Sequence, residues 1–75
     1  MTLEETALGQ RVQVCDLLIQ GSMRRRLLDL GILYDTWMEP VYDSPSGHMR
    51  AYFVNGAVIA LRDSESKRIQ VRERG

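Results

Sequence analysis

The sequence has almost none of the residues that build disulfides and metal clusters. It contains one cysteine, Cys15, and one histidine, His48. A single cysteine excludes an internal disulfide and indicates a reducing compartment. The longest apolar run, Ala57–Leu61, is too short to span a bilayer. The acidic start, MTLEET, does not resemble a secretory signal. We therefore expect a cytoplasmic protein with no direct membrane insertion.

The formal net charge is zero, because ten Lys and Arg residues balance ten Asp and Glu residues. This balance disfavours nucleic-acid binding driven by bulk positive charge. No glycine-rich phosphate loop is present. A Ser-His-acid set could come only from Ser44, Ser46 and His48, in one short loop without a rigid frame. We expect no enzymatic activity. The 75 residues, 44% of them hydrophobic, predict a single domain over residues 1–75.

The stretch Ser22–Ile32 predicts a short amphipathic helix. Ser22 suits the N-cap, and Gly31 suits the left-handed residue that closes a helix. Ile32 is then expected to fold back onto Leu27. The residues predicted to form one buried stripe, at helical spacing, are Met23, Leu27 and Leu30. So short a helix is marginal alone in water, so a sheet is expected to cover this stripe.

Strand patterns account for most of the remaining chain. Arg11–Leu17 alternates, with Val12 and Val14 on one face and Arg11, Gln13 and Cys15 on the other. Thr36–Tyr42 contains Pro40, which predicts an edge strand or a bulge. Asn55-Gly56 predicts a hairpin between Met49–Val54 and Ala57–Arg62. The side chains expected on its apolar face are those of Tyr52, Val54, Ala57, Ile59 and Leu61.

The shorter segments complete the expected order. Thr2–Ala7 is a helical turn or an ordered arm, Asp63–Lys67 a turn, and Ile69–Val71 a last strand. Five short strands without room for crossover helices predict a mainly β fold. The expected architecture is a small antiparallel barrel with one short helix between strands 1 and 2.

The residues in this order resemble the ferrous iron transport protein A (FeoA) family. The resemblance rests on RRRLLDLGI at Arg24–Ile32, on Pro45-Ser46-Gly47, and on Gly56, ALR at Ala60–Arg62 and IQV at Ile69–Val71. It implies an SH3-like barrel and a cytosolic accessory that docks on the GTP-binding part of the FeoB membrane transporter. The family pattern is altered at Tyr34-Asp35, usually Pro-Gly, and at His48-Met49 after Gly47. A related domain occurs in iron- and manganese-dependent repressors, so a metal-responsive regulatory domain is the alternative.

Candidate partner-binding residues lie on the predicted helix and in the loop with the family motif. They are Arg24, Arg25, Leu28, Gly47 and His48. Arg25 and Asp29, four residues apart, can pair on the helix surface. Leu28 lies away from the predicted stripe, so it is either a partner contact or covered by the loop after the helix. Isolated arginines suit an acidic protein surface better than a nucleic-acid duplex. A homo-oligomer also remains open.

One histidine, one cysteine and scattered carboxylates make a poor metal-ligand set. We expect no tightly bound cofactor. The candidates for a low-affinity site for Fe(II) or another divalent metal are His48, Asp43 and Cys15, and the family resemblance alone suggests that site. Cys15 itself is expected to be a core or near-core residue. The aromatic side chains of Trp37, Tyr52 and Phe53 predict packing, or a peptide groove if they cluster.

Overall fold

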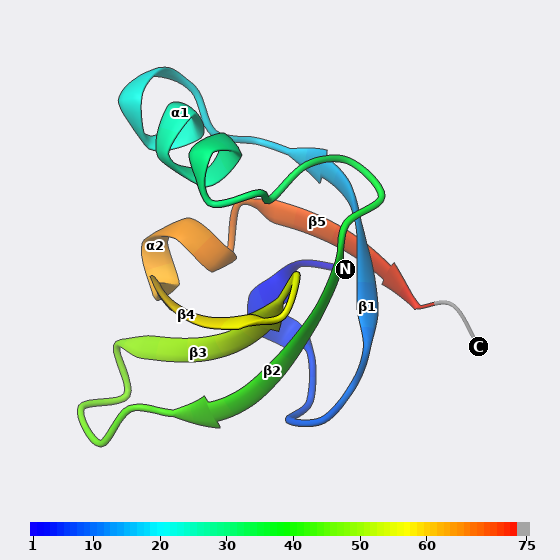
Figure 1. The fold of residues 1–75 in the computed structure, drawn as a ribbon. Helices are drawn as coiled ribbons and strands as arrows, with labels where there is room; N and C mark the ends of the chain where they lie inside the picture. The colour runs from blue at the N-terminus through cyan, green and yellow to red at the C-terminus, as the bar shows by residue number, and fades with distance from the viewer. Residues whose placement is uncertain (74–75) are drawn as a thin grey trace.

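The computed structural model describes residues 1–73, which form one five-stranded antiparallel sheet (Figure 1). The strands are β1 (Val12–Leu17), β2 (Trp37–Asp43), β3 (Met49–Val54), β4 (Ala57–Arg62) and β5 (Ile69–Glu73). The helical elements are the 3₁₀ turn η1 (Leu3–Glu5), α1 (Gly21–Asp29) and the single turn α2 (Asp63–Ser66). The sheet order is β4-β3-β2-β1-β5. The predicted mainly β, SH3-like fold with one short helix between the first two strands is confirmed.

The sheet curves into a barrel-like shape but does not close, because β4 and β5 do not pair within residues 1–73. α2 connects these two strands, and η1 packs against both β5 and α2. The N-terminal arm is part of the core rather than an accessory. The Leu3 side chain is fully buried, and the Val71 N–H donates to the Met1 carbonyl oxygen at 2.8 Å.

The β3–β4 hairpin has the predicted bounds and register. Val54 pairs with Ala57 and Tyr52 with Ile59. The turn residues Asn55-Gly56 have φ of +50° and +83°, which is the backbone that a two-residue primed turn requires. Asparagine and glycine reach this conformation at low cost, so the local sequence alone sets the register.

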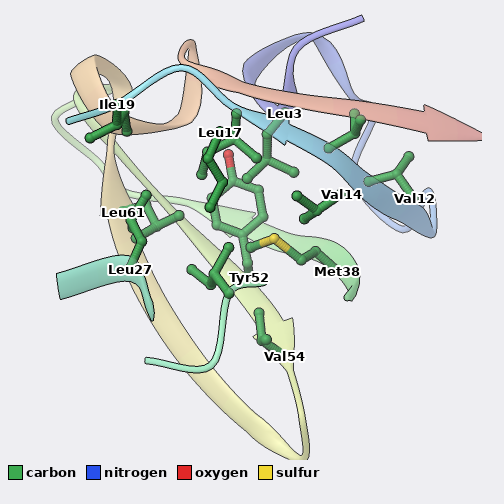
Figure 2. Close-up of a cluster of buried hydrophobic side chains, with 13 residues drawn as sticks. Leu3, Val12, Val14, Leu17, Ile19, Leu27, Met38, Tyr52, Val54 and Leu61 are labelled. Atoms are coloured by element: carbon green, nitrogen blue, oxygen red, sulfur yellow. The ribbon is translucent and has the colours of Figure 1, made fainter. Parts of the chain in front are cut away.

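The buried side chains of the hairpin meet those of the other strands in one core, part of which Figure 2 shows. Tyr52 lies at its centre, and Leu27 brings α1 into the same cluster. Of the five residues predicted on the apolar side of the hairpin, Ile59 is only half-buried and Ala57, beside the turn, is exposed. The buried core residues are Leu3, Val12, Val14, Leu17, Ile19, Leu27, Ile32, Met38, Tyr52, Val54, Leu61, Ile69 and Val71.

Pro40 lies in a central strand, so the edge-strand alternative was wrong and the bulge alternative is confirmed. The pairing of β2 with β3 shifts register between Pro40 and Tyr42. On its other side, β2 pairs with β1 only through Trp37 and Met38. Pro40 lies beyond that short ladder, so its missing N–H removes no hydrogen bond to β1.

Cys15 is exposed, which contradicts its predicted place in or near the core. The β1–β5 ladder shifts register between Val14 and Asp16, and Cys15 is the extra residue of this bulge. The predicted alternation had itself set Cys15 opposite Val12 and Val14, and the exposed thiol agrees with that alternation; the bulge instead brings Leu17 to the buried side. Gln13, expected on the outer face, is largely buried, and its Nε2 donates to the Asp35 carbonyl oxygen at 3.0 Å.

Candidate functional site

Helix α1 projects from one end of the sheet and is fixed mainly at its C-terminal end (Figure 1). The N–H groups of Gly31 and Ile32 donate to the carbonyl oxygens of Leu28 and Leu27, at 3.0 and 2.9 Å. Gly31 has φ of +86°. This is the predicted Schellman closure, and the buried Leu27 and Ile32 side chains accompany it.

The start of α1 differs from the prediction. The helix begins at Gly21, with Gln20 as N-cap, and no side chain caps its first turn. Ser22 was wrongly predicted as the cap, because Gly21 has φ of +71° and turns the chain one residue earlier.

The buried side of α1 is rotated relative to the predicted stripe. The residues on it, at helical spacing, are Arg24, Leu27, Leu28 and Gly31, of which Leu27 is buried and the others are half-buried. Leu28 packs against the core, and Arg24 Nη1 donates to the Leu17 carbonyl oxygen at 3.2 Å. Met23 and Leu30, predicted to be buried, are 38% and 36% exposed. The prediction that the side chains of Met23 and Leu30 face the core was wrong.

The chain segment that contains α1 carries several exposed hydrophobic side chains. Five lie between residues 18 and 34, namely Leu18, Met23, Leu30, Leu33 and Tyr34. Met23 and Leu30 are seven residues apart and share a flank of the helix with Arg26. An exposed apolar flank of this kind is a candidate contact surface for another protein.

A groove of about 500 Å³ separates this flank of α1 from α2. We call it the α1–α2 groove; its lining residues are Ser22, Met23, Arg26, Arg62, Ser64 and Glu65. Arg26 forms an ion pair with Glu65, whose side chain is only 4% exposed. Glu65 Oε1 also accepts a hydrogen bond from the Arg62 N–H at 2.9 Å. The Arg26–Glu65 pair joins α1 to α2 across the groove, and Arg26 and Arg62 give the groove two positive side chains.

Arg25 lies on the opposite flank of α1. Its Nε is 3.7 Å from Asp29 Oδ1, and the two side chains are 79% and 71% exposed. The predicted pairing of these residues is therefore present. The three consecutive arginines point in different directions and do not form one basic patch, as helical geometry requires.

The loop between β2 and β3 lies at the far end of the sheet from α1 (Figure 1). Gly47 has φ of +77°, and His48 is exposed, with its carbonyl oxygen accepting a hydrogen bond from the Asp63 N–H at 3.1 Å. The predicted partner-binding residues thus fall in two places. Arg24, Arg25 and Leu28 lie on α1, whereas Gly47 and His48 lie in this loop.

The candidate metal ligands do not form a cluster. Within residues 1–73, no group of three or more His, Cys, Asp or Glu side chains could hold a metal ion. Asp43 Oδ1 instead accepts a hydrogen bond from Arg50 Nε at 2.7 Å, and this bond lowers the pKa of the Asp43 carboxyl below its ordinary value. Cys15 is on β1 and His48 in the β2–β3 loop, so they come from different parts of the fold.

A second concave surface lies on the outer face of β2 and β3, with a volume of about 530 Å³. Trp37 and Phe53 both line it, whereas Tyr52 is buried in the core. The guanidinium carbon of Arg11 lies 4.8 Å from the centroid of the Trp37 ring, in a cation–π contact. Two of the three predicted aromatic residues therefore cluster at one surface.

No helix in residues 1–73 is long and apolar enough to cross a membrane. The FeoA domain model matches residues 1–73. No curated protein matches the sequence.

Solved structures show the same fold. The FeoA protein from Chlorobium tepidum is 29% identical, with a TM-score of 0.90 over 97% of this chain and 70% of that one. The FeoA-like protein from Clostridium acetobutylicum is also 29% identical, with a TM-score of 0.87 over 97% and 85% of the two chains. ScaR with bound Cd²⁺ is 18% identical, with a TM-score of 0.85, and this chain covers only 35% of it. That likeness concerns the fold alone.

Proposed function

Because the chain belongs to the FeoA domain family, a non-catalytic iron-transport accessory family, we propose that it is a cytosolic accessory of a ferrous iron transporter. It docks on the cytosolic GTP-binding part of a FeoB-like membrane protein and modulates Fe(II) transport. Through this partner it acts at the inner face of the membrane.

The exposed hydrophobic flank of α1 is the observation that supports docking at this end of the molecule. Met23, in α1, and Leu30, the C-cap residue that follows it, both keep more than a third of their surface in water. Neither is needed for the core, which α1 enters through Leu27. Burial of these two side chains in a partner would be favourable by roughly 25 cal/mol per Å² of apolar surface covered.

The α1–α2 groove suggests the chemistry of the docking segment. Arg26 and Arg62 line it beside Met23. Arg26 is already paired with Glu65, whereas Arg62 uses only its backbone N–H in that network. A segment that combines apolar side chains with an acidic residue complements this lining. We therefore place docking on Met23, Leu30 and Arg62. Arg24 and Leu28 have a positioning role, because they hold α1 on the sheet.

Two single substitutions on the exposed flank test this proposal. Met23→Glu and Leu30→Glu should each weaken binding of the purified GTP-binding domain of the transporter by about tenfold or more, because each puts a charge where apolar contact forms. The matched control is Leu8→Glu, at a side chain that is 51% exposed and lies outside α1 and α2. The dissociation constant measured by calorimetry should be the same for the control as for the wild type. Equal binding by all three variants would exclude this surface.

The alternative, a metal-responsive regulatory domain, has less support. Its structural basis is the fold shared with ScaR, and residues 1–73 contain no cluster of three or more candidate ligands. Low-affinity binding of Fe(II), or of another divalent metal, by His48, Asp43 or Cys15 remains a separate proposal. A calorimetric titration of the protein with Fe(II) tests it directly.

A further inference from the structure

The two edges of the open sheet differ in how they are protected. The β5 edge is covered by the N-terminal arm, because Thr2 forms a bridge with Gln70 and Val71 donates to the Met1 carbonyl oxygen. β5 also carries the charged side chains of Arg72 and Glu73. Covering arms and charged residues are common ways to stop an edge strand from pairing with another chain.

The β4 edge has no such cover in the described part of the chain. β4 pairs with β3 alone, and no arm or loop backbone group bonds to Val58 or Ala60. In a hairpin with a two-residue turn, Ala57 and Ile59 exchange hydrogen bonds with their β3 partners. The N–H and C=O groups of Val58 and Ala60 therefore point away from β3, at the open edge.

The composition of β4 favours pairing rather than blocking it. Ala57–Leu61 contains no charged residue and no proline, the usual edge protectors. Val58 is 54% exposed, and its neighbour across the ladder, Phe53, is 47% exposed on the same outer face. The edge thus presents unpaired backbone groups beside an exposed apolar row.

We propose that β4 pairs antiparallel with β4 of a second copy of this chain, about a two-fold axis at Ile59. Ile59 is the centre of the uncharged segment, so Val58 of each copy lies opposite Ala60 of the other. Each such pair exchanges two backbone hydrogen bonds, and no like charges meet. The two five-stranded sheets become one continuous sheet, and the exposed Val58 side chains are partly covered.

The segment is self-complementary, which is why the occupant is a second copy rather than another protein. A single strand pair buries less than the roughly 1,200 Å² of a stable interface. We therefore expect a dimer dissociation constant on the order of 10–1,000 µM. The α1–α2 groove shares only Arg62, at the end of β4, with this edge, and Arg62 lies outside the Val58–Ala60 segment that pairs. Failure of transporter docking would therefore leave this proposal standing, and the reverse is also true.

Amide hydrogen exchange at two protein concentrations tests the pairing. As the concentration rises through about 1 mM, exchange at Val58 and Ala60 should slow several-fold. Ile59, whose N–H is bonded to β3, serves as an internal control and should be protected at both concentrations. A constant rate at Val58 and Ala60 would overturn the proposal. So would protection that appears only when another protein is added.

Sedimentation of two matched variants gives an independent test. Val58→Lys adds a charge at the open edge, whereas Leu8→Lys makes the same change at a side chain with nearly equal exposure, 51% against 54%. The dimer dissociation constant should rise on the order of tenfold or more for Val58→Lys only. The proposal is contradicted if Val58→Lys dimerises with the same dissociation constant as the wild type. It is also contradicted if the wild-type protein stays monomeric at about 1 mM.

Discussion

Asn55 Nδ2 donates a hydrogen bond to the Gly31 carbonyl oxygen at 3.2 Å, which joins the end of α1 to the β3–β4 turn. The same amide nitrogen would lie only 2.8 Å from a Cβ built on Gly31. A residue at the close of the helix and a residue in a hairpin 24 positions later thus constrain each other. This contact adds to the packing of Leu27 and to the bond from Arg24 in holding α1 against the sheet.

Gly31→Ala should therefore destabilise the protein by about 1–3 kcal/mol, because left-handed strain adds to the loss of the hydrogen bond from Asn55, whose side chain must turn away. Gly9→Ala is the matched control, since Gly9 has φ of +83° and a Cβ there meets nothing within 4 Å. It should cost only the backbone strain, about 1 kcal/mol. Urea unfolding of both variants measures the difference. Equal losses would mean that the Asn55 contact adds nothing.

Arg26 should contribute more to stability than its neighbour Arg25. Arg26→Ala leaves the buried Glu65 carboxylate without its cationic partner, which we expect to cost about 1–3 kcal/mol. Arg25→Ala removes a solvent-exposed pair and should cost about 0.5 kcal/mol or less. Chemical denaturation of the two variants under identical conditions gives the comparison. A larger loss for Arg25→Ala would contradict this account of the α1–α2 groove.

Asp43 should make stability depend on acid pH. The hydrogen bond from Arg50 lowers the pKa of Asp43 in the folded state, so the folded protein holds its proton less tightly than the unfolded chain. The contribution is present above the ordinary pKa of 3.8 and is lost as the pH falls below it through the lowered folded pKa.

Asp43→Asn removes this titration while keeping the side-chain size. The difference in unfolding free energy between wild type and Asp43→Asn should therefore shrink as the pH falls below about 4. Urea titrations at several pH values between neutral and strongly acidic measure it. A difference that stays constant or grows in acid would show that the Arg50 contact does not favour the carboxylate.

The β3–β4 hairpin is a part of the fold that the local sequence determines. Asn55-Gly56 demands one turn geometry, and that geometry sets the register of both strands, so the sequence predicts them to the residue. Gly31 likewise predicts the close of α1. The bulge at Cys15 was not predicted, because it depends on how β1 pairs with the distant β5, which no local pattern records.

The candidate site was harder to predict for the same reason. A nine-residue helix with several hydrophobic residues has more than one plausible buried side, and the sequence favoured Met23 and Leu30. The contacts of α1 with the core keep Leu27, as predicted, but add Leu28 in place of Met23 and Leu30. Arg24 joins them because its long side chain reaches the Leu17 carbonyl oxygen. The groove itself needs α2, whose Glu65 meets Arg26 only in the folded chain.

The most direct measurement is a titration of the isotope-labelled protein with the cytosolic GTP-binding domain of its transporter, followed through amide NMR signals. Our account predicts that shifts and broadening concentrate on residues 18–34 and on Ser64 and Glu65 of α2, and leave Gly47 in the β2–β3 loop unchanged. Changes confined to that loop or to the outer face at Trp37 and Phe53, or no changes at all, would contradict docking through α1.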